Sequence, residues 1–490
     1  MAIVFMFSTA AFVGCGGNGG DGKKTIEIDG GGDTGQFNTT ASMEVSEANP
    51  FPYNTLETLC NEWMETHPDY NVVIRQNSIG GNRQSLTSLL STKSAPDIIY
   101  QNGAIASQDL GKGWYVPLRE YFDDPNPYNE NKSWSEVWQP GELDQDMQAD
   151  GENYYVCMER NSIGIIYNKK MFAEANIDWE IETFGDFMLA QKAISDHYGS
   201  ADSSGIVPYI ASNNWLDICL ETNMYSHLLE TCDTLRVNGR LDTEEYCRAY
   251  KKGYWTLEDD RYEEFVRLMK LSRSYYPTGW RGYDGVANFA RGNVAMLAGQ
   301  TKQLRMVLSH PSLATTGLTS EDIGFIGFPY LSSEDPAPYG TQYAEKATRR
   351  GSAGLSTAWW ISNAAIKKDT VDACVDLLMF LTAPENNNRM IGDMKGAIPL
   401  DLDAEIDPML TPLRDMYRED LSDQNRVAWA ASTCFLKFGL DYQNKFIKDS
   451  QSMDVGGNLS ESDFIQGMID YTEITVNTLI LEMEYDQTKW

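Results

Sequence analysis

The sequence predicts an α/β fold built as more than one lobe. The chain has 490 residues, more than one ordinary hydrophobic core supports, so two lobes or more are expected. Hydrophobic residues make up 42% of the chain and aromatic residues 11%, enough to form sizeable cores. Short apolar runs of strand length alternate with longer amphipathic stretches, and this alternation is typical of a sheet covered by helices.

The spacing of apolar residues predicts the first elements. A strand is expected at 25–29, and Asn54-Thr-Leu-Glu57 has the pattern of a helix start. The apolar residues that follow at helical spacing are Leu56, Leu59, Cys60, Trp63 and Met64. His67-Pro68 ends this helix, and a strand at 71–75, a helix with Leu86, Leu89 and Leu90, and a strand-like run at 97–100 come next.

The same alternation continues along the chain. Strands are expected at 163–167 and 323–328, and Thr183-Phe-Gly-Asp186 is expected to cap a helix. Val371, Cys374, Val375, Leu378 and Met379 mark another helix, and Thr382-Ala-Pro-Glu385 is expected to cap the one after it. The polar stretch 332–350 is interpreted as a surface loop, and the chain from about Asp401 onward as largely helical, ending in a helix at 460–484.

The N-terminus has the features of an export signal. Met1 to Val13 carry no charge, and Phe12-Val-Gly-Cys15 resembles the bacterial lipobox, whose cysteine receives a diacylglycerol. We therefore expect a signal peptide at 1–14, a lipidated Cys15, and a flexible linker at 15–24. The usual positively charged region is missing, so the true start is expected upstream. The predicted location is the extracytoplasmic face of the membrane, with the lipid as anchor, in a Gram-positive bacterium.

Charge and motifs exclude several classes of function. A net charge of −32 repels phosphate backbones and anionic lipids, which argues against nucleic acid as a partner. Seven cysteines besides Cys15, with no CxxC pair and only four histidines, predict neither a disulfide framework nor a metal site. Gly30-x-Gly32-x-x-Gly35 lacks the helix of a dinucleotide site, and the GxSxG, P-loop and HExxH motifs are absent. We expect no cofactor and no catalytic residues.

Several segments, in order, resemble the family 1 extracellular solute-binding proteins, the sugar-binding subunits of ABC importers. They are Asn61-Glu-Trp-Met-Glu-Thr-His-Pro-Asp69, Ser94-Ala-Pro-Asp-Ile-Ile-Tyr100, Gly111-Lys-Gly-Trp-Tyr-Val-Pro-Leu118, Ile163-Gly-Ile-Ile-Tyr-Asn-Lys169, Phe289-Ala-Arg-Gly-Asn-Val-Ala-Met296, Ile326-Gly-Phe-Pro329 and Phe380-Leu-Thr-Ala-Pro-Glu385. The resemblance covers roughly residues 25 to 400. Each motif alone is weak, but their common order is specific.

The resemblance implies a two-lobed, periplasmic-binding-protein-like α/β fold of class II type, with hinge strands and a helical C-terminal region. It places crossings near Arg160, Phe328 and Gly396. One lobe is then expected to hold 25–160 plus 328–395, and the other 161–327 plus 396–490. The resemblance also implies that a carbohydrate, expected to be an oligosaccharide, binds between the lobes. The protein is expected to be a monomer whose partners are the permease subunits of an ABC transporter.

A sugar site needs aromatic plates and a few polar side chains. Two candidates, Gln101 and Asn102, directly follow a strand that ends at the family's cleft. The other candidates are Glu159, Arg160 and Asn161 at the first crossing, Trp215 and Trp280 in the second lobe, Gln300 after the Phe289 motif, and Trp359. Trp359 and Trp360 are expected to point to opposite faces of a strand.

Two other functions stay open from the sequence. An exported glycoside hydrolase or lyase would need two carboxylates that converge on one bond, and 71 acidic residues leave that open. The same fold could instead bind a peptide, a polyamine or an oxidised anion, or the protein could be the partner of a sensor. With 39 Lys and Arg residues in the whole chain, an anion is mildly disfavoured.

Overall fold

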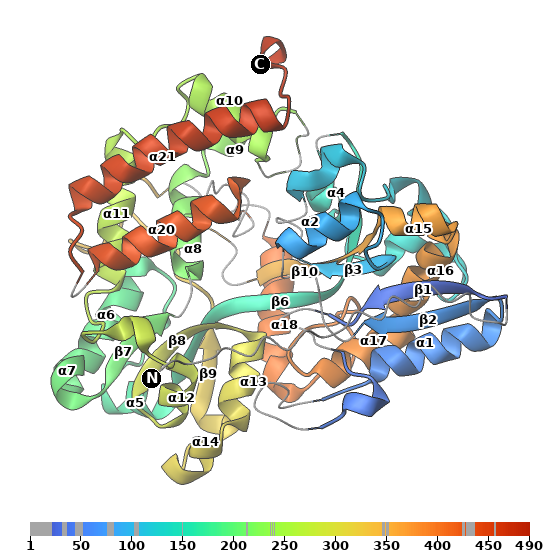
Figure 1. Cartoon of the computed structure of the whole chain (residues 1–490). Coiled ribbons are helices and arrows are strands. Elements are labelled where there is room, and N and C mark those ends of the chain that lie inside the picture. Colours follow the sequence, from blue (N-terminus) through green and yellow to red (C-terminus); the bar gives the residue numbers. More distant parts are fainter. Residues whose placement is uncertain are drawn as a thin grey trace, which may run out of the picture.

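The computed structural model describes residues 22–31, 37–44, 52–75, 83–101, 107–148, 150–211, 214–235, 237, 239, 241–344, 348, 352–423, 427, 437–454 and 457–490. Two groups of strands and helices flank one long strand, β6 (Tyr155–Asn168), which crosses from one group to the other (Figure 1). We call the group that contains the N-terminal strands the first lobe and the other group the second lobe.

The first lobe is a sheet covered on both faces. Its strands lie in the order β2 (Tyr70–Arg75), β1 (Lys24–Asp29), β3 (Ile98–Gln101), β10 (Ser352–Ile361) and β6. β1 is parallel to β2 and β3, whereas β10 is antiparallel to both β3 and β6. The helices of this lobe are α1 (Thr55–Thr66), α2 (Arg83–Ser91), α4 (Glu142–Asp146), α15 (Asn363–Lys368), α16 (Val371–Thr382) and α17 (Pro384–Met394).

The apolar stripe expected for the first helix is the buried face of α1. Leu56, Leu59, Cys60 and Trp63 are buried in one cluster together with residues of α16 and α17. A second cluster on the opposite face of the sheet contains Leu86, Leu90 and Ile99. These helices and the strands at 24–29, 70–75 and 98–101 confirm the predicted α/β alternation.

The second lobe has a single continuous core. Here β8 (Val294–Gln300) and β9 (Ile323–Ile326) both pair with β6 in antiparallel orientation, and β7 (Val207–Ala211) is parallel to β8. The helices before β9 are α5 (Lys169–Glu174), α6 (Phe184–Tyr198), α7 (Ala201–Ser204), α8 (Trp215–Tyr225), α9 (Leu228–Cys232), α10 (Thr243–Lys251), α11 (Asp260–Ser272), α12 (Gly285–Ala290), α13 (Thr301–Ser309) and α14 (Pro311–Thr316).

The C-terminal region is helical, as predicted. It forms α18 (Thr411–Ser422), α20 (Gly439–Met453) and α21 (Glu461–Glu482), and Ser460 caps α21 by accepting a hydrogen bond from the Asp463 amide. α20 and α21, drawn in red in Figure 1, pack against each other, and α21 lies against α10 and α11 of the second lobe. Phe446, Phe464 and Met468 belong to the core of that lobe.

Two local predictions differ from the structure. The strand expected at 163–167 begins eight residues earlier, at Tyr155. The sequence did not indicate this extension, because residues 155–162 are all buried and show no alternation of apolar and polar side chains. Thr382 does not cap the next helix: it ends α16, where its hydroxyl donates to the Leu378 carbonyl at 2.8 Å, and α17 begins at Pro384. Proline at the first helical position needs no amide partner.

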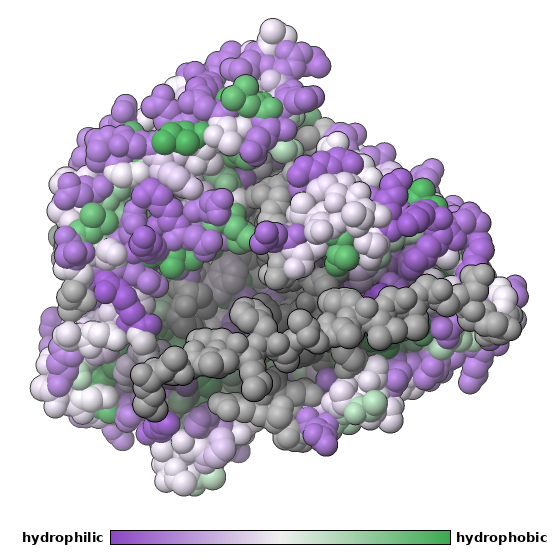
Figure 2. Space-filling view, in the orientation of Figure 1, coloured by the Kyte–Doolittle hydropathy of each residue, from purple (hydrophilic) through white to green (hydrophobic). Residues whose placement is uncertain are grey.

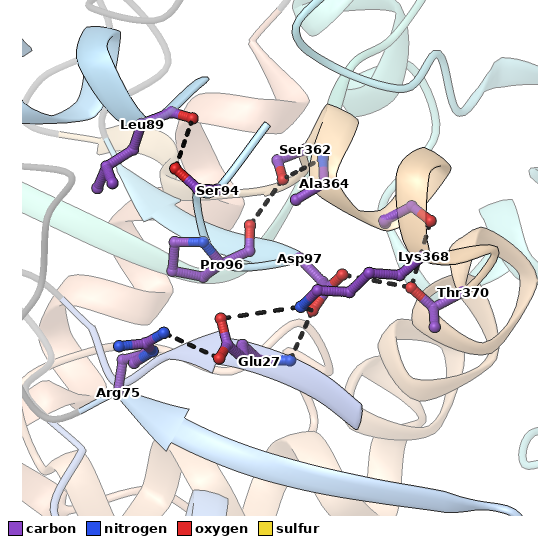
Figure 3. A network of polar contacts seen from close by, with 11 residues as sticks. Glu27, Arg75, Leu89, Ser94, Pro96, Asp97, Ser362, Ala364, Lys368 and Thr370 are labelled. Carbon is purple, nitrogen blue, oxygen red and sulfur yellow. Dashed lines mark hydrogen bonds and ion pairs between the residues drawn. The ribbon is translucent and has the colours of Figure 1, made fainter. Parts of the chain in front are cut away.

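The buried carboxylate of Asp97 holds the start of β3 in place in the first lobe. Asp97, which precedes β3, accepts hydrogen bonds at 2.7 Å from the Glu27 amide and from Lys368 Nζ (Figure 3). Its other oxygen accepts from the Thr370 hydroxyl at 3.3 Å. Asp97 therefore joins β1, β3 and the loop between α15 and α16, and its role is structural.

We expect Asp97→Asn to lower the free energy of unfolding by about 2 kcal/mol, because an amide cannot accept all three hydrogen bonds. The measurement is urea unfolding. Asp369→Asn is the control, since Asp369 pairs with Lys24 at 2.7 Å on the surface, and it should leave stability unchanged. Equal stability of the Asp97 variant and the wild type would contradict this role.

The six described cysteines, Cys60, Cys157, Cys219, Cys232, Cys247 and Cys374, are all buried as free thiols. Burial raises the pKa of Cys60 to about 12, so this thiol behaves as an inert apolar group. Among the described residues, no helix has the length and apolar composition needed to cross a membrane. Cys15 and the predicted signal and linker at 1–14 and 15–24 lie outside the described residues, apart from 22–24.

Candidate functional site

The carboxyl ends of strands from the two lobes point toward each other along β6. β3 has the same direction as β6 because both are antiparallel to β10, whereas β8 runs opposite to β6. β3 ends at Gln101, which pairs with Ala358 and through it aligns with Cys157. β8 ends at Gln300, which pairs with Ile163.

Residues 158–162 of β6 therefore span the interval between the two strand edges. In open α/β sheets ligands bind outside the carboxyl ends of the strands. Figure 2 shows the surface hollowed between the lobes in the region where β6 crosses. We define the cleft strip as residues 158–162 together with the ends of β3, β7 and β8.

Glu159 and Asn161 lie on one face of the cleft strip, because side chains alternate along a strand. Glu159 is only 2% exposed, and the Tyr100 hydroxyl at the end of β3 donates to its Oε1 at 3.3 Å. Asn161 Oδ1 accepts from the Thr301 hydroxyl at 2.9 Å, and Thr301 directly follows β8. These two side chains thus link β6 to the first and the second lobe respectively.

Two tyrosines, Tyr100 and Tyr53, lie near Glu159 on the side of the first lobe, and further aromatic rings pack behind them. Burial, and then the negative charge of Glu159, raise the pKa of the Tyr53 hydroxyl above its ordinary value. The Phe37 ring lies between Tyr53 and Trp359, at centroid distances of 5.4 and 6.1 Å. Trp359 is buried and packs edge-on against Tyr100 at 4.8 Å. Trp359 therefore supports Tyr100 from within the core.

The other first-lobe candidates lie at the end of β3. Gln101 is buried, and its Nε2 donates to the Tyr115 hydroxyl at 3.0 Å. Its Oε1 has no hydrogen-bond partner among the described residues, so this acceptor is available at the strand end. Asn102 lies outside the described residues. Trp360 points to the opposite face from Trp359, in the cluster with Tyr115, as the alternation predicts.

The second-lobe candidates lie at the ends of β7 and β8. Gln300 is half-buried at the last position of β8, and its backbone N–H donates to Gln303 Oε1 at 2.9 Å. Trp215 is the first residue of α8, which follows β7, and it is half-buried against the core. Trp280 is 7% exposed and packs against Tyr276 at 5.0 Å. Gln300 and Trp215 lie at the cleft strip, and Trp280 lies deeper.

Arg160 belongs to the framework, because its side chain is fully buried and bonded at every nitrogen. Nε and Nη2 donate to the carboxylate of Glu142 at 2.9 and 2.6 Å, and Nη1 donates to the carbonyls of Pro399 and Leu400 at 2.7 Å each. The Tyr417 hydroxyl also donates to Glu142. The backbone of Arg160 pairs with Ile398. We call this set the Arg160 clamp.

Sequence reasoning did not single out four residues that contact or adjoin the candidates of the cleft strip: Tyr53, Tyr100, Tyr115 and Thr301. Tyr100 and Thr301 each adjoin a predicted candidate, so the signal was their position at a strand end. No local pattern places Tyr53 near Glu159, because the two residues are about a hundred positions apart in the chain. No group of three or more His, Cys, Asp or Glu residues within the described ranges could hold a metal ion.

Two lobes joined by a continuous crossing strand, with polar and aromatic groups at the facing strand ends, define a protein that binds a solute between its lobes. A family described as bacterial extracellular solute-binding proteins matches residues 58–411, and the chain belongs to this family. This confirms the resemblance found in the sequence and implies an extracytoplasmic location.

Solved structures confirm the two-lobed fold. RafE from Streptococcus pneumoniae has 17% identity and a TM-score of 0.58, over 94% of this chain and 99% of RafE. The GacH receptor of Streptomyces glaucescens GLA.O has 14% identity and a TM-score of 0.56, over 94% and 99%. A structure from work on xylan utilization by Caldanaerobius polysaccharolyticus has 14% identity and a TM-score of 0.59, over 92% and 99%. No curated protein matches the sequence.

Proposed function

We propose that this protein binds a carbohydrate, an oligosaccharide in particular, between its lobes and delivers it to the permease of an ABC importer. The observation that carries the proposal is the cleft strip, where Glu159 and Asn161 lie between the carboxyl ends of β3 and β8. A carboxylate, two amides and nearby tyrosines match the hydroxyl rim and the apolar faces of a sugar. The proposed lobes are 25–160 plus 328–395 and 161–327 plus 396–490.

Two structural relatives support a sugar as the ligand class. RafE has been solved in complex with raffinose, and GacH in complex with acarbose. Each of them is covered at 99% of its length by this chain, so the same two lobes are present in all three proteins. Because the sequence identity is low, the side chains of the cleft differ between these proteins. The particular sugar bound by this protein therefore depends on its own cleft side chains.

The N-terminal sequence supports a lipid anchor. We infer that Cys15 carries the lipid, that 1–14 is the signal peptide, and that 15–24 is the tether, on the outer face of a Gram-positive membrane. A tether of this kind raises the effective concentration of a monomeric binding protein near its permease. Closure of the lobes on the sugar would then give the permease a two-state signal.

A melting scan against a panel of sugars tests the proposed function. A sugar present at 100 times its dissociation constant should stabilise the protein by about 2.7 kcal/mol, which raises the melting midpoint. The panel contains raffinose, maltotriose, cellotriose and xylotriose, and a peptide mixture and spermidine are the comparison. If only a peptide or the polyamine raises the midpoint, the sugar proposal is wrong. Release of reducing ends from an oligosaccharide would favour an enzyme instead.

A further inference from the structure

A small cavity lies at the carboxyl edge of the second-lobe sheet. Its volume is about 20 Å³, and its lining includes Tyr209, Ala211, Asn214 and Trp280. Ala211 is the last residue of β7, and Asn214 directly precedes α8. Since Ala211 pairs with Ala298 of β8, two residues before Gln300, the cavity adjoins the cleft strip.

Two of the residues that line this cavity each have a buried polar atom with no protein partner within the described part of the chain. They are Trp280 Nε1, on a side chain 7% exposed, and the Tyr209 hydroxyl, on a side chain 1% exposed. An unsatisfied buried donor costs about 1–3 kcal/mol, so native proteins fill such positions with a water or a ligand group. The indole can only donate, whereas the phenol can donate or accept.

The charged groups beside the cavity are already paired with one another. Arg273 Nη2 lies 2.5 Å from Asp217 Oδ2, and Arg273 Nη1 lies 2.8 Å from Asp454 Oδ2. Asn214 Nδ2 also donates to Asp217 at 2.7 Å. The two carboxylates would repel an anion, and a cation that entered the cavity would have to compete with Arg273 for them. The cavity therefore suits a neutral polar group.

We infer that this cavity is a side pocket of the solute cleft that takes the exocyclic hydroxymethyl group of a hexose unit. This inference rests on the proposed function. The oxygen of the sugar hydroxyl would accept a hydrogen bond from Trp280 Nε1, and the same hydroxyl would donate a hydrogen bond to the Tyr209 oxygen, so both of these buried atoms would gain a partner. The volume of about 20 Å³ is close to that of one water, which leaves room for this arm and not for a pyranose ring.

Sugar pairs that differ only in this group give a direct test. The pairs are D-glucose with D-xylose, D-galactose with L-arabinose, and cellotriose with xylotriose. Calorimetry gives the dissociation constant of each sugar. The wild-type protein should bind the hexose member of the tightest pair at least about tenfold more tightly than the pentose member. Trp280→Phe and Tyr209→Phe should each reduce this ratio to below about threefold.

Trp255→Phe is the matched control, because Trp255 is a buried tryptophan of the same core that does not line the cavity. It should keep the wild-type ratio, and melting midpoints show that all variants are folded. The inference is overturned if the wild type binds both members of a pair equally. It is also overturned if the Trp280 and Tyr209 variants keep the ratio, or if raffinose binds while no matched pair does. If no sugar binds at all, the proposed function itself fails.

Discussion

Arg160→Met is expected to lower the free energy of unfolding by about 3–5 kcal/mol, as measured by urea unfolding. The guanidinium is 0% exposed, and its loss leaves the Glu142 carboxylate buried without its cation. The same change removes the two hydrogen bonds to the carbonyls of Pro399 and Leu400. Methionine has a similar volume, so the loss reports the buried charge and the hydrogen bonds more than a cavity.

A second substitution separates charge from packing. Glu142→Gln in the Arg160→Met background removes the stranded charge and keeps an acceptor for Tyr417, so it should restore part of the lost stability. Arg389→Met is the matched surface control: Arg389 pairs with Glu62 at 2.7 Å, but both side chains are 40% exposed, and the loss should stay below about 1 kcal/mol. Equal losses for the two arginines would show that the Arg160 clamp has no special role.

The fold could be predicted from the sequence because its signals are local. Apolar spacing over a few residues placed α1, and short motifs in a common order indicated the solute-binding family. The local signal failed at 155–162, where a strand buried on both sides shows no alternation. The prediction for Thr382 was wrong because its hydroxyl bonds within α16, to the Leu378 carbonyl, and also accepts from Trp134 Nε1 at 2.8 Å, a residue far away in the sequence.

The site could be predicted only in part, because a polar residue beside a strand end can face either the cleft or the framework. Glu159, Arg160 and Asn161 are consecutive, and nothing local separates them. The pairing of β6 with β10 and β8 does so, because alternation sends Arg160 to the face opposite its two neighbours. Trp359 and Trp280 are buried for a different reason: most aromatic residues that could stack on a sugar are part of a hydrophobic core instead.

The two faces of β6 therefore have different tasks. The Arg160 clamp ties the strand to the chain segment at 398–400 and to α18, while Glu159 and Asn161 lie on the opposite face, where we propose that the solute binds. A strand held rigidly on one face keeps the side chains of the other face in place for binding. Loss of the clamp should thus reduce stability first, whereas loss of a cleft side chain should reduce affinity first.

Glu159→Gln is expected to weaken binding of the best sugar of the panel by tenfold to a hundredfold, measured by calorimetry. The reason is that a hydrogen bond to a charged acceptor contributes about 1.5–3 kcal/mol, and the amide that replaces it has one acceptor oxygen fewer. Glu159 is 2% exposed between the ends of β3 and β8, where a solute hydroxyl would meet its carboxylate together with the Tyr100 hydroxyl. The dissociation rate should rise more than the association rate falls.

The matched control is Glu245→Gln, since Glu245 is also a buried glutamate but accepts hydrogen bonds from the amides of Thr234 and Leu235, in the segment between α9 and α10. It should lower the melting midpoint and leave the affinity within about twofold of wild type. Tyr100→Phe removes the hydroxyl that bonds Glu159 at 3.3 Å and should weaken binding less than the Glu159 variant. If Glu159→Gln changed only the melting midpoint, as the control does, then Glu159 would belong to the framework with Arg160, and the cleft strip would depend on Asn161 and Gln101 alone.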